Sequence, residues 1–308
     1  MSTEVTRRRA WVIAARPQTL PAAAAPVAVG VGLALGDGVF APLPALAALV
    51  GASLIQIGTN FANDYYDAVN GADTDDREGF TRVVASGLID PGAVRRAMWL
   101  AFAAAVAVGT YLVAVGGVPI LVVGVVSVAA GIAYTGGPYP LGYHGLGDLF
   151  VFVFFGVVAV AGTYYVQAAA LVGGAVPVTP PAGTVTLAGV VAGVPIAALS
   201  TNILVVNNLR DREEDAATGK RTLAVRFGPR FARAEYLAMT ALAYLTPVWF
   251  AATGRGAAAL PLVTLPLAAA VTRTVLTETS GEALNPALES TGRLLAAYAA
   301  AFAVGLAL

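Results

Sequence analysis

Long apolar stretches alternate with short polar ones along this 308-residue chain. A helix that crosses a bilayer needs about 20 mainly apolar residues. The pattern therefore predicts an all-α integral membrane protein, a single domain over 1–308 with residues 1–10 as a short cytoplasmic N-terminal segment. The nine transmembrane helices that we expect are 11–35, 42–66, 93–114, 118–135, 148–170, 184–207, 230–252, 256–277 and 291–308.

The composition agrees with a membrane protein and excludes several kinds of site. Hydrophobic residues make up 58% of the chain and charged residues only 12%, whereas soluble domains carry about 25% charged residues. The absence of cysteine excludes disulfides, thiolate metal sites and cysteine nucleophiles. A single histidine, His144, is too few for a histidine-built metal site. The net charge is zero, which by itself indicates nothing about partners. Among the partners we expect there is no nucleic acid.

The placement of basic residues gives an orientation. Nine spans put the N-terminus and every second connection on one side, and 17 of the 18 Lys and Arg residues fall there. Only Arg255 falls on the other side. Since cytoplasmic loops carry an excess of Lys and Arg, this pattern predicts a cytoplasmic N-terminus. All acidic residues except Asp37 lie on or beside the same face, so the polar chemistry is expected at the cytoplasmic end.

Two acidic clusters, residues 60–77 and 207–223, each follow a long apolar stretch. Both contain an asparagine, an aspartate four residues later and then a further aspartate. Residues four apart share a helix face, and oxygen ligands suit Mg²⁺, which in turn suits phosphate. We expect the clusters to face each other and hold a diphosphate through two Mg²⁺ ions. The candidate metal ligands are Asn63, Asp67, Asp73, Asn207, Asp211 and Asp215. The candidate catalytic residues are Asp67, Asp211, Asn63 and Asn207.

Basic residues accompany both clusters, and they favour a phosphate site over a cation pathway. The candidate diphosphate-binding residues are Arg16, Arg82, Lys220 and Arg77. A pore for cations would not place so many positive groups beside its acids, whereas a diphosphate site needs them. Two alternatives stay open: an acidic loop that only caps helices, and a transporter of Mg²⁺ or another cation. Asn60 and Asp64 form a second pair in the first cluster, offset from the first pair.

The fourth connection, residues 134–148, is rich in Gly, Pro and Tyr, so it is expected to be a structured loop. Its aromatic residues lie on the expected active face and could form the wall of a site for an aromatic substrate. They could equally be membrane anchors, which is common for interfacial Tyr. The candidate acceptor-binding residues are Tyr134, Tyr139, Tyr143 and His144.

At these residues the sequence resembles the UbiA superfamily of intramembrane prenyltransferases. The matching stretches are ARPQTLPAAAAPVAVG (15–30), NFANDYYDAVNGADTDDR (60–77), RVVASGLI (82–89), YTGGPYPLGYHGLGD (134–148) and NNLRDREEDAATGKRTLAVRFG (207–228). They spread across the first three quarters of the chain. The resemblance implies a nine-helix bundle with a lipid-open central cavity that cytoplasmic loops cap. It also implies that the six candidate ligands named above bind Mg²⁺ and diphosphate.

The first cluster departs from the common spacing of the superfamily, because Asp67 and Asp73 are six residues apart instead of four. This longer form resembles the branch that prenylates 1,4-dihydroxy-2-naphthoate. The resemblance therefore implies Mg²⁺-dependent transfer of a polyprenyl group to this ring with loss of carbon dioxide, in menaquinone biosynthesis. The implied partners are a polyprenyl diphosphate, 1,4-dihydroxy-2-naphthoate and the lipid bilayer of the cell membrane. Another aromatic or lipid acceptor remains the nearest alternative.

Overall fold

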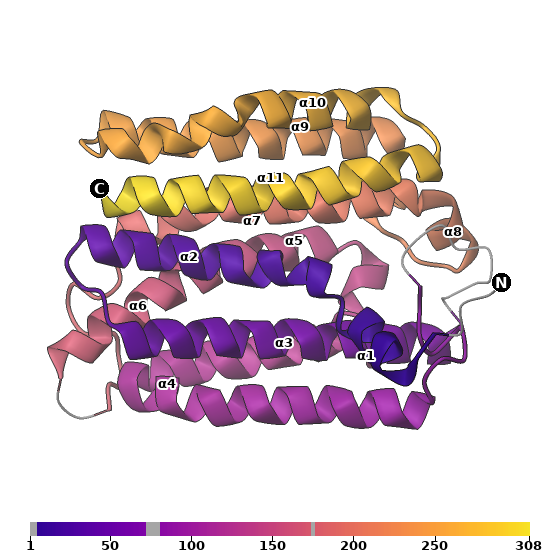
Figure 1. Ribbon diagram of the computed structural model, residues 1–308, viewed down its shortest axis with the longest axis horizontal. Coiled ribbons are helices and arrows are strands. Elements are labelled where there is room, and N and C mark those ends of the chain that lie inside the picture. The colour runs from indigo at the N-terminus through magenta and orange to yellow at the C-terminus, as the bar shows by residue number, and fades with distance from the viewer. Residues whose placement is uncertain (1–4, 72–80, 174–175) are drawn as a thin grey trace.

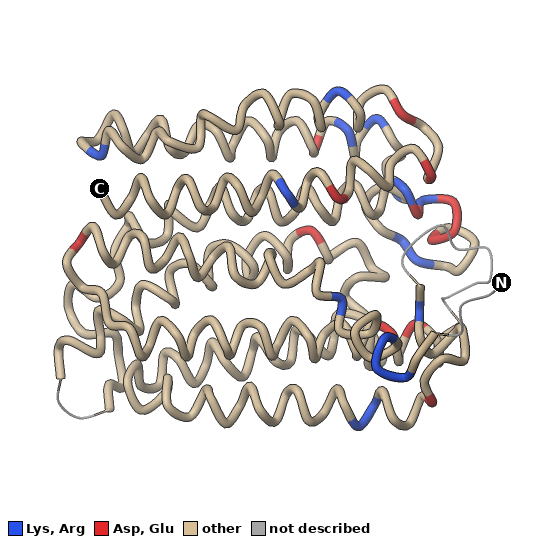
Figure 2. The backbone as a smooth tube through the Cα atoms, viewed as in Figure 1, with Lys and Arg blue, Asp and Glu red and all other residues tan. Residues whose placement is uncertain are grey.

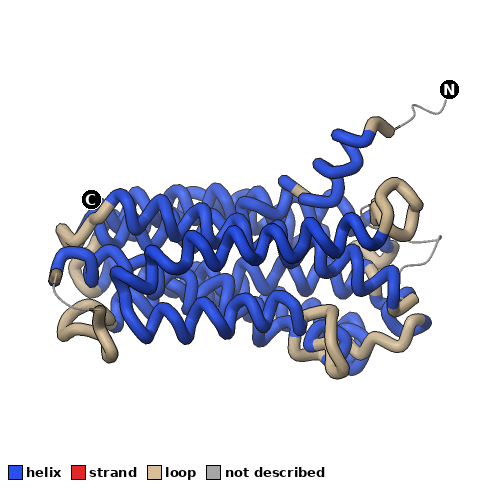
Figure 3. The backbone as a smooth tube through the Cα atoms, turned by 90° about the horizontal axis from the view of Figure 1, so that it is seen from below, coloured by secondary structure: helices blue, strands red, loops and turns tan. Residues whose placement is uncertain are grey.

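The computed structural model describes residues 5–71, 81–173 and 176–308. Within these residues all regular structure is helical, and the long helices lie side by side in one bundle (Figures 1 and 3). The helices are α1 Arg7–Ala15, α2 Leu20–Gly36, α3 Pro42–Val69, α4 Pro91–Ala133, α5 Gly147–Val151, α6 Ala159–Val172, α7 Leu187–Arg210, α8 Arg212–Ala217, α9 Leu223–Ala252, α10 Leu265–Thr277 and α11 Gly281–Ala307. The 3-10 segments are η1 Pro17–Thr19, η2 Leu141–His144 and η4 Gly256–Thr264, and the π-helical segment η3 is Phe152–Val158.

The described part of the chain contains seven helical segments that are long and apolar enough to cross a membrane. One of them is α4, whose 43 residues contain a break at Gly117, with φ 70° and ψ −155°. A Cβ on Gly131 would lie 3.6 Å from the ring of Phe102, so the two limbs of α4 run antiparallel. A side chain at Gly117 would overlap the carbonyl oxygen of Pro177. The single α4 therefore holds the two spans expected at 93–114 and 118–135.

The first expected span, 11–35, is wrong at its start. Residues up to Ala15 belong to the separate helix α1, which projects away from the bundle in Figure 3. The backbone of Arg16 adopts a left-handed conformation with φ 50°, and Pro17 follows it. Proline has no N–H to continue the helical bonding, so α2 begins only at Leu20.

Two other helices begin earlier than the apolar pattern indicates. The helix α9 starts at Leu223 instead of residue 230, across a kink at Gly228, and α11 starts at Gly281 instead of residue 291. Arg226, Gly228 and Pro229 interrupt the apolar run at the start of α9, and the start of α11 contains Glu282, Asn285 and Pro286. The apolar pattern therefore marks only the remainder of each helix. Because of this mixed composition, α9 is not among the seven apolar segments.

Close helix contacts at small residues hold the centre of the bundle together. Gly32 of α2 packs on the backbone of Ala303 in α11, and Gly156 of η3 packs on Ala197 in α7. The window of α7 that could span a membrane is 72% buried, so this helix lies at the centre of the fold. Small residues allow such close approach of helices in lipid.

Most charged residues lie toward the end of the bundle where the N-terminus lies (Figure 2). At the opposite end, Arg255 forms an ion pair with Asp37, which also accepts a hydrogen bond from Tyr164 at 2.9 Å. This contact ties η4, α2 and α6 together. The distribution places the candidate site at the charged end.

Candidate active site

Lys220 joins the two acidic clusters. Its Nζ lies 3.8 Å from Oδ1 of Asp67 in the first cluster and 3.8 Å from Oδ1 of Asp215 in the second. These two carboxylate oxygens are therefore no more than twice that distance apart. The prediction that the ends of α3 and α7 face a common site is consistent with this geometry. Lys220 is positioned by the turn after α8, where Gly219 adopts φ 81° and the Lys220 N–H donates to the Asp215 carbonyl.

Asp67 is the buried carboxylate of the first cluster that contacts Arg82, Tyr143 and Lys220. It is 2% exposed, near the C-terminal end of α3. Arg82 donates to it at 2.8 Å and the Tyr143 hydroxyl at 2.5 Å. One turn earlier, the amide oxygen of Asn63 accepts a hydrogen bond from Thr135 at 3.0 Å. Charge-assisted bonds of this kind are stronger than neutral ones, so they fix Asp67 and Arg82 together.

Asn60 and Asp64, the offset pair, hold neighbouring segments in place. Asp64 is fully buried, accepts hydrogen bonds from the backbone N–H groups of Val83 and Val84 and lies 4.0 Å from Arg16. The Asn60 side chain donates to the carbonyl of Ala15 and to the hydroxyl of Thr19. This pair therefore positions the two segments that carry Arg82 and Arg16.

The second cluster follows the end of α7. Asn207 is in its last turn, Asp211 separates α7 from α8, and Asp215 is on α8. The backbone N–H of Asp211 donates to Asn207, and that of Asp215 donates to Asp211, so the three residues keep helical spacing across the junction. Asp211 and Asp215 are 5% and 7% exposed. Their predicted common stripe is present.

Arg210 is a contact of the second cluster that the sequence reasoning did not single out. Its guanidinium donates to both carboxylate oxygens of Asp211, at 2.6 and 2.9 Å, and to the amide oxygen of Asn207 at 2.9 Å. It also donates to Asn285 at 3.1 Å, which ties the cluster to α11. The sequence shows that an arginine precedes Asp211, but it does not show which way the side chain of this arginine points.

The fourth connection divides into two parts. Tyr143 and Tyr134 face the acidic clusters: Tyr143 bonds Asp67, and Lys220 lies 4.9 Å from the centre of its ring. Tyr139 and His144 stack on each other at 3.7 Å, with Tyr139 55% exposed. The backbone of Tyr143 accepts a hydrogen bond from Arg221 at 2.7 Å, which fastens the loop to the second cluster. An acceptor-binding role for these four residues stays a prediction.

The hydroxyl of Tyr134 remains a hydrogen-bond donor. Desolvation raises its pKa, and the negative charges of Asp148, Asp67 and Asp215 raise it further. Loss of the phenolic proton would add another negative charge beside these carboxylates. Tyr134 therefore presents a neutral hydroxyl where the two clusters meet.

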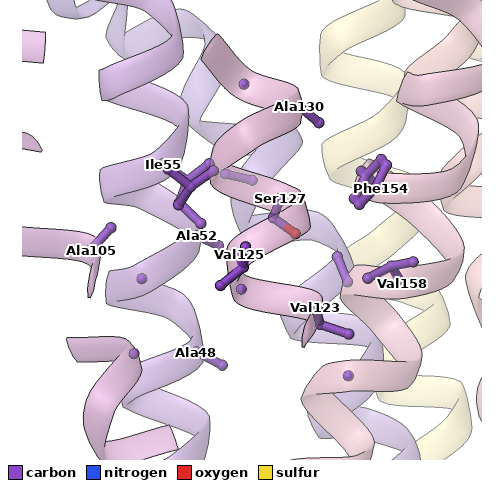
Figure 4. A pocket seen from close by; sticks show the side chains of 18 of the residues that line it. Ala48, Ala52, Ile55, Ala105, Val123, Val125, Ser127, Ala130, Phe154 and Val158 are labelled. Atoms are coloured by element: carbon purple, nitrogen blue, oxygen red, sulfur yellow. The ribbon is translucent and has the colours of Figure 1, made fainter. Parts of the chain in front are cut away.

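An apolar cavity of about 680 Å³ extends from Tyr134 into the bundle. Its walls come from α2, α3, both limbs of α4, and the α5–η3–α6 helix. In Figure 4, Ser127 and Ala130 of α4 lie on the side that faces Phe154 and Val158 of η3. A cavity with such walls suits a hydrocarbon chain and excludes water from its neighbourhood.

The residues present suit Mg²⁺ as far as the structure describes them. Asp73 and Arg77 lie outside the described residues. Within the described residues, no three acidic or histidine side chains converge closely enough to hold an ion by themselves. The available donors are carboxylate and amide oxygens, and Mg²⁺ in proteins often takes one or two carboxylates and completes its shell with phosphate and water. Asp67 on one side and Asp211 and Asp215 on the other fit this mode.

The fold and site define a membrane-embedded helical protein in which acidic and basic groups meet at the mouth of an apolar cavity. The chain belongs to the UbiA prenyltransferase family, whose profile matches residues 23–304. It is 40% identical to the 1,4-dihydroxy-2-naphthoate octaprenyltransferase of Mycobacterium tuberculosis over 298 residues, which cover 96% of each chain.

Two solved structures share the fold. The apo structure of a UbiA homolog from Aeropyrum pernix matches with a TM-score of 0.69 and 16% identity, covering 91% of this chain and 96% of that one. A UbiA homolog from Archaeoglobus fulgidus bound to DMAPP and Mg²⁺ matches with a TM-score of 0.55 and 16% identity, covering 96% and 99%.

Proposed function

We propose that this protein transfers a polyprenyl group from an allylic diphosphate to 1,4-dihydroxy-2-naphthoate, with loss of carbon dioxide, to give demethylmenaquinol. The observation that carries the proposal is the meeting of Asp67, Lys220 and Asp215 close to Tyr134, which lines an apolar cavity. The name of the M. tuberculosis relative supports the naphthoate acceptor.

The basic residues bind the diphosphate in this proposal. Arg82 and Lys220 lie within ion-pair distance of Asp67. Arg16 lies beside Asp64, which is on the same helix as Asp67. When Mg²⁺ is bound, it neutralises charge on the departing diphosphate. Asn63 and Asp67 would hold it on one side, and Asn207, Asp211 and Asp215 on the other. The A. fulgidus homolog with DMAPP and Mg²⁺ supports the use of this ion.

The remaining task of the protein is to place the ring against the allylic carbon and to exclude water. The apolar cavity holds the prenyl chain, so the reactive carbon stays at the charged mouth. Tyr134 and Tyr143 flank that mouth. Fixing two reactants in contact removes much of the entropic part of the barrier, and a dry site protects an allylic cation from hydrolysis.

The proposed setting is the cell membrane, crossed nine times, with the N-terminus and the active site on the cytoplasmic side. The two limbs of α4 and the amphipathic α9 bring the seven apolar segments to nine crossings. The gathering of Lys and Arg at the site end supports the cytoplasmic placement.

Purified protein tests the function directly. It is incubated with Mg²⁺, a polyprenyl diphosphate and a panel of aromatic acceptors, and products are identified by mass. We expect a decarboxylated prenyl product from 1,4-dihydroxy-2-naphthoate, and none when the metal is chelated. A product from another aromatic acceptor alone would reassign the substrate. Mg²⁺ movement across vesicles without prenyl diphosphate would instead indicate the transporter alternative.

The metal assignment predicts that Asp67→Ala and Asp211→Ala each lower turnover by roughly 100-fold or more, because charge on the leaving diphosphate is no longer neutralised. Glu213→Ala is the matched control, since Glu213 lies in the second cluster with its side chain 91% exposed. Turnover is measured at saturating Mg²⁺, with the folded state checked by thermal unfolding in detergent. Normal Mg²⁺-dependent turnover by either variant would refute the assignment.

A further inference from the structure

Asp148, in the first turn of α5, is a buried carboxylate without a partner. It is 6% exposed, and neither of its oxygens has a hydrogen-bond partner among the described residues. A buried charge without a partner is strongly destabilising, and such groups in a native protein call for an explanation such as a ligand or a catalytic role. Asp148 ends the Tyr134–Asp148 connection, but the proposed function has not used it.

Asp148 lies close to Tyr134, which lines the cavity and is also influenced by the charges of Asp67 and Asp215. Val151, three residues later on the same helix face, lines the cavity, as does Tyr134. A Cβ on the neighbouring Gly147 would lie 2.9 Å from the Tyr134 hydroxyl. Asp148 is also the largest carboxylate contribution to the raised pKa of Tyr134, ahead of Asp67 and Asp215. These observations place Asp148 beside Tyr134 and one helical turn from the cavity wall.

The surroundings of Asp148 differ from those of the other carboxylates at the site. Asp67 pairs with Arg82 and Lys220, Asp215 with Lys220, and Asp211 with Arg210. No ion pair with Asp148 occurs in the described part of the chain. A diphosphate would be repelled by such a group, so its ligand must offer a hydrogen-bond donor. At the mouth of this cavity, the reactant that carries donors is a hydroxylated aromatic ring.

We propose that Asp148 binds the acceptor through the ring hydroxyl next to the carboxylate-bearing carbon, and that it takes the proton of that hydroxyl during the reaction. This inference rests on the proposed function. The proton passes to Asp148 as the ring carbon bonds to the allylic carbon and the bond from that carbon to diphosphate breaks. Carbon dioxide then leaves, its bonding electrons stay in the ring, and the ring oxygen takes the proton back from Asp148.

Asp148→Asn tests the proposal, because it keeps the shape of the side chain and removes its capacity to take a proton. We expect kcat/KM for the acceptor to fall by about 100-fold or more, the range that a positioned acid–base group contributes. The KM for the prenyl diphosphate should stay within about twofold, because charge-assisted binding of diphosphate does not involve Asp148. The matched control is Asp90→Asn, since Asp90 is also at a helix N-terminus, where it caps α4 through the N–H of Ala93.

Two further measurements separate a catalytic role from a structural one. Removing a buried unpaired charge should leave the thermal midpoint of the protein unchanged or higher, whereas a structural carboxylate would lower it. The acceptor with a methyl ether at the adjacent hydroxyl should react slowly with the unmodified protein. Asp148→Asn should add no further loss with this ether, because both changes remove the same interaction.

Three results would overturn the assignment: unchanged kcat/KM for the acceptor in Asp148→Asn, a lowered thermal midpoint, or full additivity with the methyl ether. A change confined to the KM of the prenyl diphosphate would also overturn it. Failure of the proposed function looks different, because the unmodified protein would then give no prenylated naphthoate at all.

Discussion

Single residues decide how the two clusters meet. Lys220 stands between Asp67 and Asp215, whose negative charges would otherwise repel each other across a short distance. The left-handed turn at Gly219 places Lys220 there. Its position in the sequence is outside both Asn/Asp pairs, yet in space it is the link between them. A diphosphate arriving at the mouth of the cavity would meet this ammonium group together with Arg82.

Lys220→Met is therefore expected to weaken use of the prenyl diphosphate. Loss of a hydrogen bond to a charged group is worth about 2 kcal/mol, which corresponds to roughly 30-fold in kcat/KM. The measurement is kcat/KM with prenyl diphosphate varied at saturating acceptor. Arg230→Gln is the control, because Arg230 is an exposed basic residue nearby in the chain. If Lys220→Met and Arg230→Gln behave alike, Lys220 is not a diphosphate ligand.

At the scale of elements, α3 anchors the segments that carry the basic residues. Two pairs of side chains on α3 have different partners. Asn63 and Asp67 contact residues of the candidate site. Asn60 and Asp64 form hydrogen bonds with the backbone of neighbouring segments. Asp64 holds the segment after residue 80 through two backbone N–H groups. The geometry of Arg82 therefore depends on a carboxylate one turn away from the one that Arg82 contacts.

Asp64→Ala should both destabilise the fold and weaken diphosphate binding. The N–H groups of Val83 and Val84 lose their acceptor, and each buried donor left unpaired costs about 1–3 kcal/mol. We expect a lower midpoint of thermal unfolding in detergent and a raised KM for prenyl diphosphate. Ser86→Ala is the control in the same segment, because Ser86 is exposed and its hydroxyl donates to the local carbonyl of Arg82. A normal KM in Asp64→Ala would show that Arg82 does not need this anchor.

The helices were largely predictable because a bilayer imposes a minimum length on every apolar stretch. The pattern failed where local backbone conformation, or Gly, Pro and charged residues inside a helix, interrupted the apolar run, as at Arg16 and near the starts of α9 and α11. The four-residue spacing also predicted that the Asn and Asp residues of each cluster lie on one helix face, because this spacing gives a common face in any helix. The contacts of Arg210 and the isolation of Asp148 were not predictable, because they depend on which helices pack beside α7 and α5.

The whole molecule separates charge from hydrocarbon. Ionic groups gather at one end, and the cavity runs from that end between α3, α4 and the η3–α6 helix (Figures 2 and 4). A prenyl diphosphate has the same division, with a strongly negative head and an apolar chain. The diphosphate and the prenyl chain would bind at different depths. The prenyl chain length that the protein accepts should therefore depend on cavity residues far from the diphosphate site.

Val123 and Val122 test this dependence as a matched pair in the second limb of α4. Val123 lines the cavity, whereas its neighbour Val122 does not and is 55% exposed. Val123 is eleven residues from Tyr134, which corresponds to about 16 Å along a helix. We expect Val123→Phe to lower kcat/KM for a long polyprenyl diphosphate by roughly 10-fold or more, because overpacking a filled cavity costs about 1–3 kcal/mol.

Dimethylallyl diphosphate should react with Val123→Phe at a nearly normal rate, because its five-carbon chain ends well before this depth. Val122→Phe adds the same ring on the outer face and should leave both substrates unaffected. The measurement is kcat/KM for a series of prenyl diphosphates of increasing length with each variant. If Val123→Phe lowered kcat/KM equally for short and long prenyl diphosphates, the prenyl chain would not bind in this cavity. The substitution would then act by disturbing the fold and not by blocking the substrate.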